Sequence, residues 1–152
     1  MTDSIWRPHT TVAAIAEHDG KFLLVKEKIA GEIVFNQPAG HLNPGESLID
    51  AVIRETLEET RYEFLPDKLQ GIYRLVAGED SDITYIRFLF RGKIGRNLGG
   101  KLDDDIISAH WMSYDEIRAC NEQHRSPLVM QCIDDYLNNE PYPLDILSKN
   151  YA

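Results

Sequence analysis

Three glutamates, Glu55, Glu58 and Glu59, stand close together in a segment with helical character. At about 100° per residue they share an arc of about 100° on one side of a helix. Like charges at this spacing repel, by roughly 0.3 kcal/mol per pair, and a bound cation reverses that penalty. Mg²⁺ prefers hard oxygen ligands and keeps water and phosphate oxygens in its shell. The stripe therefore predicts a metal site that polarises a phosphoryl oxygen.

Taken alone, the same stripe is also compatible with a solvated acidic face. The residues upstream decide between the two interpretations, because Gly40, Glu46 and Arg54 stand at fixed offsets from the glutamates. Such a set arises by chance in on the order of one in 10⁵ chains of this length. The combination favours a built site.

The glutamates need a helix to position them, and Ser47 to Thr60 predicts one. Ser47 is a suitable N-cap with Asp50 at the third helical position, although a start at Asn43-Pro44-Gly45-Glu46 is an alternative. We expect the apolar side to face a sheet; it comprises Ile49, Ile53, Thr56 and Leu57.

Strands are predicted around this helix. Asp19-Gly20 between two β-prone runs indicates a hairpin. In the strand at 84–94 we expect Ile86, Phe88 and Phe90 to face the core, with Tyr85, Arg87, Leu89 and Arg91 on the other face. The predicted strands are 10–16, 22–25, 33–38, 69–77, 84–94 and 105–111.

Two further helices follow the last strand. Ser113 to Glu116 has the pattern of a capping box, and Ser126-Pro127 opens a segment with apolar residues at helical spacing. Strands mixed with three helices, without regular βαβ alternation, predict one α/β domain with a mixed sheet and helices on both faces.

The net charge of −9 argues against broad binding of nucleic acids. No apolar run is long enough to span a membrane, and the first residues show no signal peptide. The two cysteines, Cys120 and Cys132, lack metal-ligand spacing and are expected to be reduced thiols. We expect a cytoplasmic protein.

The pattern Gly40, Glu46, Arg54-Glu55, Glu58-Glu59 resembles the Nudix box, G-x5-E-x7-R-E-U-x-E-E-x-G-U with U apolar. The resemblance implies a Nudix-type α/β/α sandwich, here at 5–145 with a tail at 146–152. It also implies hydrolysis of diphosphate linkages with Mg²⁺ or Mn²⁺. Thr56 replaces an aliphatic residue, and Arg61 replaces the final glycine, which commonly adopts the left-handed conformation after a helix.

The resemblance also implies roles for these residues. Glu58 and Glu59 would bind the metal, Glu55 would serve as ligand or base, and the carbonyl of Gly40 would complete the site. Arg54 would orient a glutamate, and Glu46 would brace the loop. Many Nudix enzymes draw one more acid from a later loop. In the run at 103–105 we choose Asp105 as extra ligand or general base; a solvated charge run is the alternative.

The substrate-binding residues are predicted less directly. Arg87, in mid-strand, needs a phosphate, a site glutamate or an intramolecular ion pair. Lys26 follows a strand and is suited either to terminal phosphates or to solubility. Phe35, Tyr73 and Tyr85 are candidates for stacking on a ring or for simple packing. His41, beside Gly40, would contact a phosphate or the substrate ring, or have no role.

The flanking run Asn36 to His41 resembles a group of phosphatases within the Nudix family. That resemblance implies removal of the terminal phosphate from nucleoside tri- and diphosphates, from thiamine diphosphate and from hydroxymethylpyrimidine pyrophosphate. The partner would be a small phosphorylated substrate, with no nucleic acid or membrane; oligomeric state stays open. Alternatives are hydrolysis of ADP-ribose, a dinucleoside polyphosphate or capped RNA, and a nucleotide-sensing module without catalysis.

Overall fold

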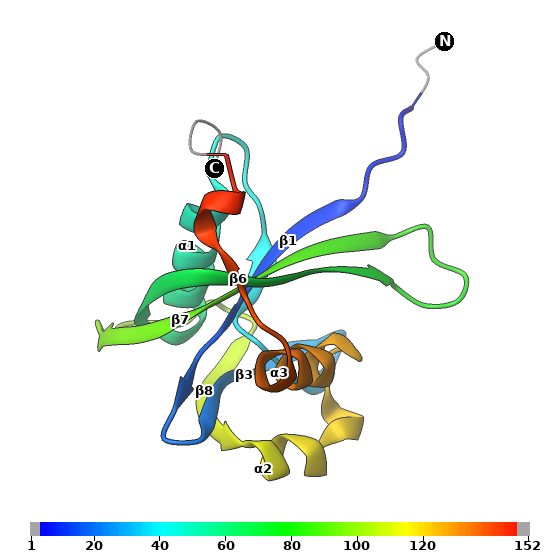
Figure 1. The fold of residues 1–152 in the computed structure, drawn as a ribbon. Helices are drawn as coiled ribbons and strands as arrows, with labels where there is room; N and C mark the ends of the chain where they lie inside the picture. Colours follow the sequence, from blue (N-terminus) through cyan, green and yellow to red (C-terminus); the bar gives the residue numbers. More distant parts are fainter. Residues whose placement is uncertain (1–3, 149–152) are drawn as a thin grey trace.

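The computed structural model describes residues 4–148, which form two β-sheets flanked by helices (Figure 1). The larger sheet has the order β5-β1-β7-β6-β9. Strand β1 pairs parallel to β7, and the other neighbours are antiparallel. Its strands are β1 (His9–Ile15), β5 (Ala39–His41), β6 (Tyr62–Val76), β7 (Thr84–Asn97) and β9 (Tyr142–Pro143).

The smaller sheet is built on β3, which pairs antiparallel with all of its neighbours. The Asp19-Gly20 turn that joins β2 to β3 has positive φ at both residues, as predicted for a tight hairpin. The strands are β2 (Glu17–His18), β3 (Lys21–Ile29), β4 (Glu32–Asn36) and β8 (Ile106–Ser113).

The larger sheet is buried on both faces, which confirms the α/β/α arrangement. Alternate residues of β1 point into two separate cores: Val12 and Ala14 face helix α1 (Leu48–Thr60), while Ala13 and Ile15 face helix α3 (Leu128–Asn138). Each face is therefore covered by one layer of helix.

The expected assignment of a single core face to β7 is wrong. Phe90 is fully buried on the α1 side, but Leu89 is fully buried on the α3 side. A strand covered on both faces carries apolar residues at consecutive positions, so alternation alone does not identify its core face.

Helix α1 begins as predicted, but the face that it buries differs from the predicted one. The Ser47 hydroxyl accepts from the backbone N–H of Asp50 at 3.0 Å and caps the helix. The buried residues include Val52, Glu55 and Glu59, whereas Ile53 and Leu57 are only half-buried. The acidic side of α1 thus faces the protein, and the expected burial of Ile53 and Leu57 against the sheet is wrong.

The remaining helices are short. Helix α2 (Tyr114–Ala119) has the predicted capping box between Ser113 and Glu116. The 3-10 turns η1 (Asn121–Gln123) and η2 (Leu144–Ile146) lead into α3 and away from β9. The predicted tail at 146–152 lies partly outside the described residues. Within 4–148, no helix combines the length and apolar character needed to cross a membrane.

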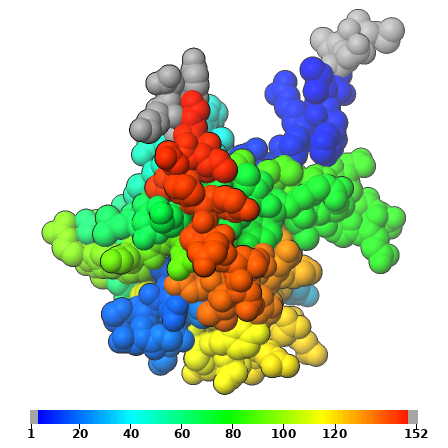
Figure 2. Space-filling model, in the orientation of Figure 1, coloured from blue at the N-terminus to red at the C-terminus, as the bar shows by residue number. Residues whose placement is uncertain are grey.

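The β6–β7 hairpin and the N-terminal arm stand out from the body of the molecule (Figure 2). The indole N–H of Trp6 in the arm donates to the carbonyl of Asp82 in the hairpin at 3.1 Å. Strand β5, which pairs with β1, places Gly40 against the acidic side of α1.

Candidate active site

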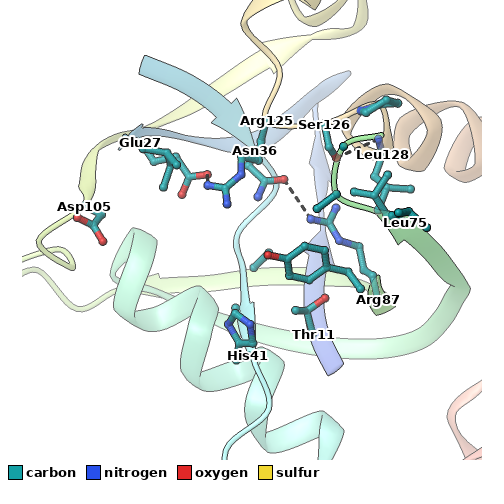
Figure 3. A pocket seen from close by; sticks show the side chains of 18 residues that line it. Thr11, Glu27, Asn36, His41, Leu75, Arg87, Asp105, Arg125, Ser126 and Leu128 are labelled. Atoms are coloured by element: carbon teal, nitrogen blue, oxygen red, sulfur yellow. Dashed lines mark hydrogen bonds and ion pairs between the residues drawn. The ribbon is translucent and has the colours of Figure 1, made fainter. Parts of the chain in front are cut away.

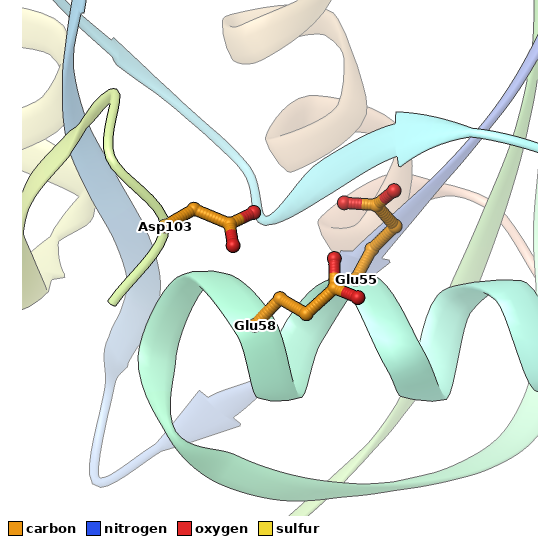
Figure 4. A group of neighbouring side chains, drawn as sticks. All are labelled: Glu55, Glu58 and Asp103. Carbon is orange, nitrogen blue, oxygen red and sulfur yellow. The ribbon is translucent and has the colours of Figure 1, made fainter. Parts of the chain in front are cut away.

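Helix α1 and the β7–β8 loop bring three carboxylates together. Oxygens of Glu55, Glu58 and Asp103 lie within 4.8 Å of one another (Figure 4). The loop is fixed to the helix, since the backbone N–H of Asp103 donates to the carbonyl of Glu58 at 3.1 Å. A compact set of carboxylate oxygens, one of them buried, matches the preference of a hard divalent cation.

Arg54 braces this cluster from one side. Its Nε and Nη2 donate to both carboxylate oxygens of Glu46, at 2.9 and 2.6 Å. Its Nη1 donates to Glu55 at 2.8 Å and to Glu58 at 3.2 Å. The hydrogen bond from Arg54 lowers the pKa of Glu46. Arg54 therefore fixes the orientation of two cluster glutamates while Glu46 fixes Arg54.

Gly40 lies directly against the carboxylate of Glu55. A Cβ at this position would overlap all three carboxyl atoms of Glu55. The close approach of strand to helix requires a glycine here. Arg54 Nη2 also donates to the carbonyl of His41 at 3.0 Å, which holds the same loop against the helix.

Glu59 lies outside the cluster, in a more enclosed place. It is 7% exposed, and its Oε1 accepts from the backbone N–H of Ala39 at 2.7 Å. Burial raises the pKa of Glu59 to about 9, with contributions from the negative charges of Glu27, Glu55 and Asp103. Burial also raises the pKa of Glu55. A nearby divalent cation would favour the ionised form of both groups.

A cleft of about 640 Å³ adjoins Gly40, and its size is typical of small-molecule sites (Figure 3). Arg87 lies in its wall and is 7% exposed. Its Nη1 donates to Gln37 and its Nη2 to Asn36, both at 3.3 Å. Both acceptors are neutral amides, and no ion pair involves Arg87 within residues 4–148. Its charge is therefore available to an anion in the cleft.

A second guanidinium lines the same wall. Arg125 lies 3.5 Å from the carboxylate of Glu27, which is 7% exposed and whose pKa is raised by burial. The backbone N–H of Arg125 donates to the carbonyl of Phe35 at 2.8 Å, which ties this segment to β4. The inner wall thus carries two arginines around Asn36, with one buried acid beside them.

Two ring side chains also line the cleft. His41 and Tyr85 both line the cleft, and their centroids are 6.3 Å apart. His9 Nδ1 lies 3.1 Å from His41 Nε2. Desolvation, together with the neighbouring His9, lowers the pKa of His41. A neutral imidazole beside a phenol suits an edge or face contact with a substrate ring.

Three other predicted residues lie elsewhere. Phe35 and Lys26 are direct partners in the β3–β4 register, so their side chains share a face of the smaller sheet. Phe35 packs against the core on the α3 side. Neither residue lines the cleft. Tyr73 also faces that core, where its hydroxyl donates to Asp135 at 2.8 Å. Asp105 lines the cleft but is not a member of the acidic cluster.

Arg61 takes the place of the family glycine without changing how the helix ends. It adopts the left-handed conformation, with φ of 63°, and its N–H donates to the carbonyl of Leu57 at 2.8 Å. Its Nε donates to the carbonyl of Gly99 at 2.7 Å. That bond joins the end of α1 to the loop that carries Asp103.

The sequence reasoning missed Asp103, Glu27 and Arg125. Asp103 stands in the acidic run at 103–105, but the sequence of this run does not indicate which carboxylate reaches the helix. Glu27 has a weak signal, since it is an acid within an otherwise apolar and basic strand. Arg125 lies in a loop whose position depends on tertiary contacts alone.

Comparison with known proteins agrees with this geometry. The NUDIX domain model matches residues 6–132. Phosphatase NudJ of Escherichia coli strain K12 is 35% identical over 144 residues, which cover 94% of this chain and 92% of that protein.

Solved structures of Nudix hydrolases also resemble this fold. A NUDIX hydrolase from Nitrosomonas europaea superposes with a TM-score of 0.90 at 52% identity, covering 93% of this chain and 97% of that one. The MutT NUDIX hydrolase from Burkholderia pseudomallei superposes with a TM-score of 0.72 at 18% identity, covering 85% of this chain and 98% of that one. The second likeness shows the fold alone.

Proposed function

Because the chain belongs to the Nudix hydrolase family, whose members act on phosphoanhydride bonds, we propose that it removes the terminal phosphate from nucleoside tri- and diphosphates with Mg²⁺. The observation that carries this proposal is the juxtaposition of the acidic cluster with a cleft lined by Arg87, whose hydrogen-bond acceptors are neutral amides. The similarity to a phosphatase supports a terminal rather than an internal bond as the site of cleavage.

The donor set fits a divalent cation. Glu58 and Asp103 would hold it, with Glu55 beside them. Glu59 lies outside this cluster and accepts from the backbone N–H of Ala39. Gly40 leaves the room that a side chain would fill. When bound, Mg²⁺ supplies charge that stabilises the developing negative charge on phosphoryl oxygens.

The residues of the chain supply binding and proton transfer. Arg87 binds and orients the phosphate chain, and Arg125, which is paired with Glu27, lies at the same wall. Glu55 Oε1 accepts from Arg54, which leaves Oε2 to take a proton from the attacking water. The raised pKa of Glu55 suits a general base, because a more basic carboxylate accepts a proton more readily. The products are orthophosphate and the shortened substrate.

The ring of the substrate is proposed to pack in the cleft against the exposed surface of the His41–Tyr85 pair, whose rings contact each other. We extend the proposal to thiamine diphosphate and hydroxymethylpyrimidine pyrophosphate. Phe35 and Lys26, which lie outside the cleft, are not assigned a contact with substrate.

The test is a substrate panel with Mg²⁺ in which orthophosphate and pyrophosphate are measured separately. We expect orthophosphate from nucleoside triphosphates, nucleoside diphosphates and thiamine diphosphate, and its loss in EDTA. Glu58→Gln should lower kcat by at least about 10², as expected for loss of a group that positions the reacting atoms. Asp50→Asn, on the exposed side of the same helix, is the control.

Other products would indicate a different activity. Nucleoside monophosphate formed from ADP-ribose, without orthophosphate from triphosphates, would identify an internal pyrophosphohydrolase. Binding of nucleotide with no product from any member of the panel would identify a sensing module.

A further inference from the structure

A second cleft, of about 450 Å³, opens where the two sheets separate. Glu17, His18 and Trp111 line it from the smaller sheet, and Tyr62 and the 93–95 segment of β7 line it from the larger one. In Figure 2 it lies between the blue β2–β3 hairpin and the light-green end of β7.

This second cleft is separate from the active-site cleft. The active-site cleft includes Thr11, near the start of β1, whereas the second cleft includes Glu17, just beyond the end of β1. A strand rises about 3.3 Å per residue, so Thr11 and Glu17 are roughly 20 Å apart along the chain, and the two clefts share no lining residue. A ligand in one does not reach the residues of the other.

Three aromatic rings meet in the second cleft. The indole of Trp111 lies 6.2 Å from the ring of Tyr62 and 6.1 Å from the ring of His18, at interplanar angles of 71° and 61°. All three residues retain exposed surface. Partly exposed aromatic side chains around a concave surface favour a planar ring, which buries their faces.

The cleft is lined by one cationic side chain, Lys93, and one acid, Glu17. His18 lies 3.3 Å from Asp19. Lys93 is exposed, and no ion pair engages it in the part of the chain that the structure describes. The imidazole therefore has a partner within the protein, Glu17 contributes a negative charge from the smaller sheet, and the ammonium of Lys93 on the larger sheet is available to a ligand.

We propose that this second cleft binds a planar heteroaromatic group that carries an anionic substituent, the chemistry of a nucleoside monophosphate. The ring stacks against Trp111, and Lys93 pairs with the phosphate. Stacking without base-edge hydrogen bonds tolerates different rings, so the site selects for the combination of ring and anion.

AMP is the probe, titrated into the ¹⁵N-labelled protein in EDTA so that no metal-dependent turnover occurs. The indole N–H of Trp111 and the amide of Gly95 report on the second cleft; Gly40 and Gly78 report on the active-site cleft. The Trp6→Phe variant identifies the Trp111 indole signal, because the chain contains two tryptophans.

We expect AMP to shift the Trp111 and Gly95 signals to saturation, and adenosine or ribose 5-phosphate to bind there at least about fivefold more weakly. Lys93→Gln should weaken binding of AMP at Trp111 by roughly fivefold, the factor contributed by one exposed ion pair. Lys68→Gln, an exposed lysine of β6 outside both clefts, should leave it unchanged.

Two outcomes would overturn the proposal. Shifts confined to Gly40 and Gly78 would restrict AMP to the active-site cleft. Equal affinity in the wild type and in Lys93→Gln would show that the cleft does not recognise the anion. Lys93 is exposed, so Lys93→Gln should not unfold the protein. Unchanged signals elsewhere in its spectrum verify that the variant is folded.

Discussion

Replacing Gly40 with alanine tests whether the active site depends on the close approach of the β5 loop to Glu55. The φ of Gly40 is not positive, so an alanine is compatible with the backbone itself. The added methyl, however, would overlap the Glu55 carboxylate, which Arg54 holds at 2.8 Å. Either the loop must move away from α1, or Glu55 must leave Arg54 and the acidic cluster.

The size of the effect follows from these two choices. Overpacking of a rigid contact costs about 1–3 kcal/mol of stability, and losing the charge-assisted bond from Arg54 costs a similar amount, about 1.5–3 kcal/mol. A displacement of about 1 Å in a positioned catalytic group lowers turnover by about 10²-fold. We therefore expect Gly40→Ala to fold with reduced stability and to retain about one per cent of wild-type kcat.

The assay combines orthophosphate release, its dependence on Mg²⁺ concentration and thermal unfolding. Gly95→Ala is a matched control, since its Cβ would also approach a glutamate, Glu63, but only at 3.1 Å from a side-chain oxygen, a contact that a small shift relieves. Wild-type kcat and Mg²⁺ dependence in Gly40→Ala would refute the reasoning, because Glu55 would then tolerate displacement without loss of function.

Three further changes test other parts of the site. Because burial raises the pKa of Glu59 from 4.5 to about 9, the metal-free protein should lose stability as the pH rises between these values. Glu59→Gln should remove that loss of stability, which is on the order of 4 kcal/mol at pH 7.5. The same substitution should lower turnover by orders of magnitude. If the wild type and Glu59→Gln show identical profiles of stability against pH in EDTA, the burial argument is wrong. Arg87→Gln should raise KM at least about tenfold with a smaller effect on kcat, and an unchanged KM for every phosphorylated substrate would exclude it from binding. Arg61→Gly relieves a strain of about 1 kcal/mol but loses the bond to Gly99, so unfolding measurements should show a net change below about 1 kcal/mol.

Local signals in the sequence predicted the start of α1, the Asp19-Gly20 hairpin and the capping box at Ser113. Each depends on residues within a few positions of one another, so the sequence contains the whole interaction. The pairing of Glu46 with Arg54 joins the helix to its preceding loop, whereas the resemblance implied only that Glu46 braces that loop.

Contacts between distant segments were not predictable in the same way. Asp103 and Asp105 are two residues apart in one acidic run, and only the hydrogen bond from Asp103 to the carbonyl of Glu58 selects which of them reaches the helix. Likewise, Phe35 is beside Asn36 in sequence, but strand alternation sends one side chain to the core and the other to the cleft.

The orientation of α1 has a physical consequence that its sequence pattern conceals. Hydrophobicity alone would bury Ile53 and Leu57, yet the helix buries Glu55 and Glu59 and leaves those two apolar residues half-exposed. Desolvating two carboxylates opposes folding, and Arg54 and the Ala39 N–H offset only part of that cost. A divalent cation that bound the folded state alone would supply the remainder by mass action. The inward acidic face lowers the stability of the metal-free protein, and such a cation would offset that cost.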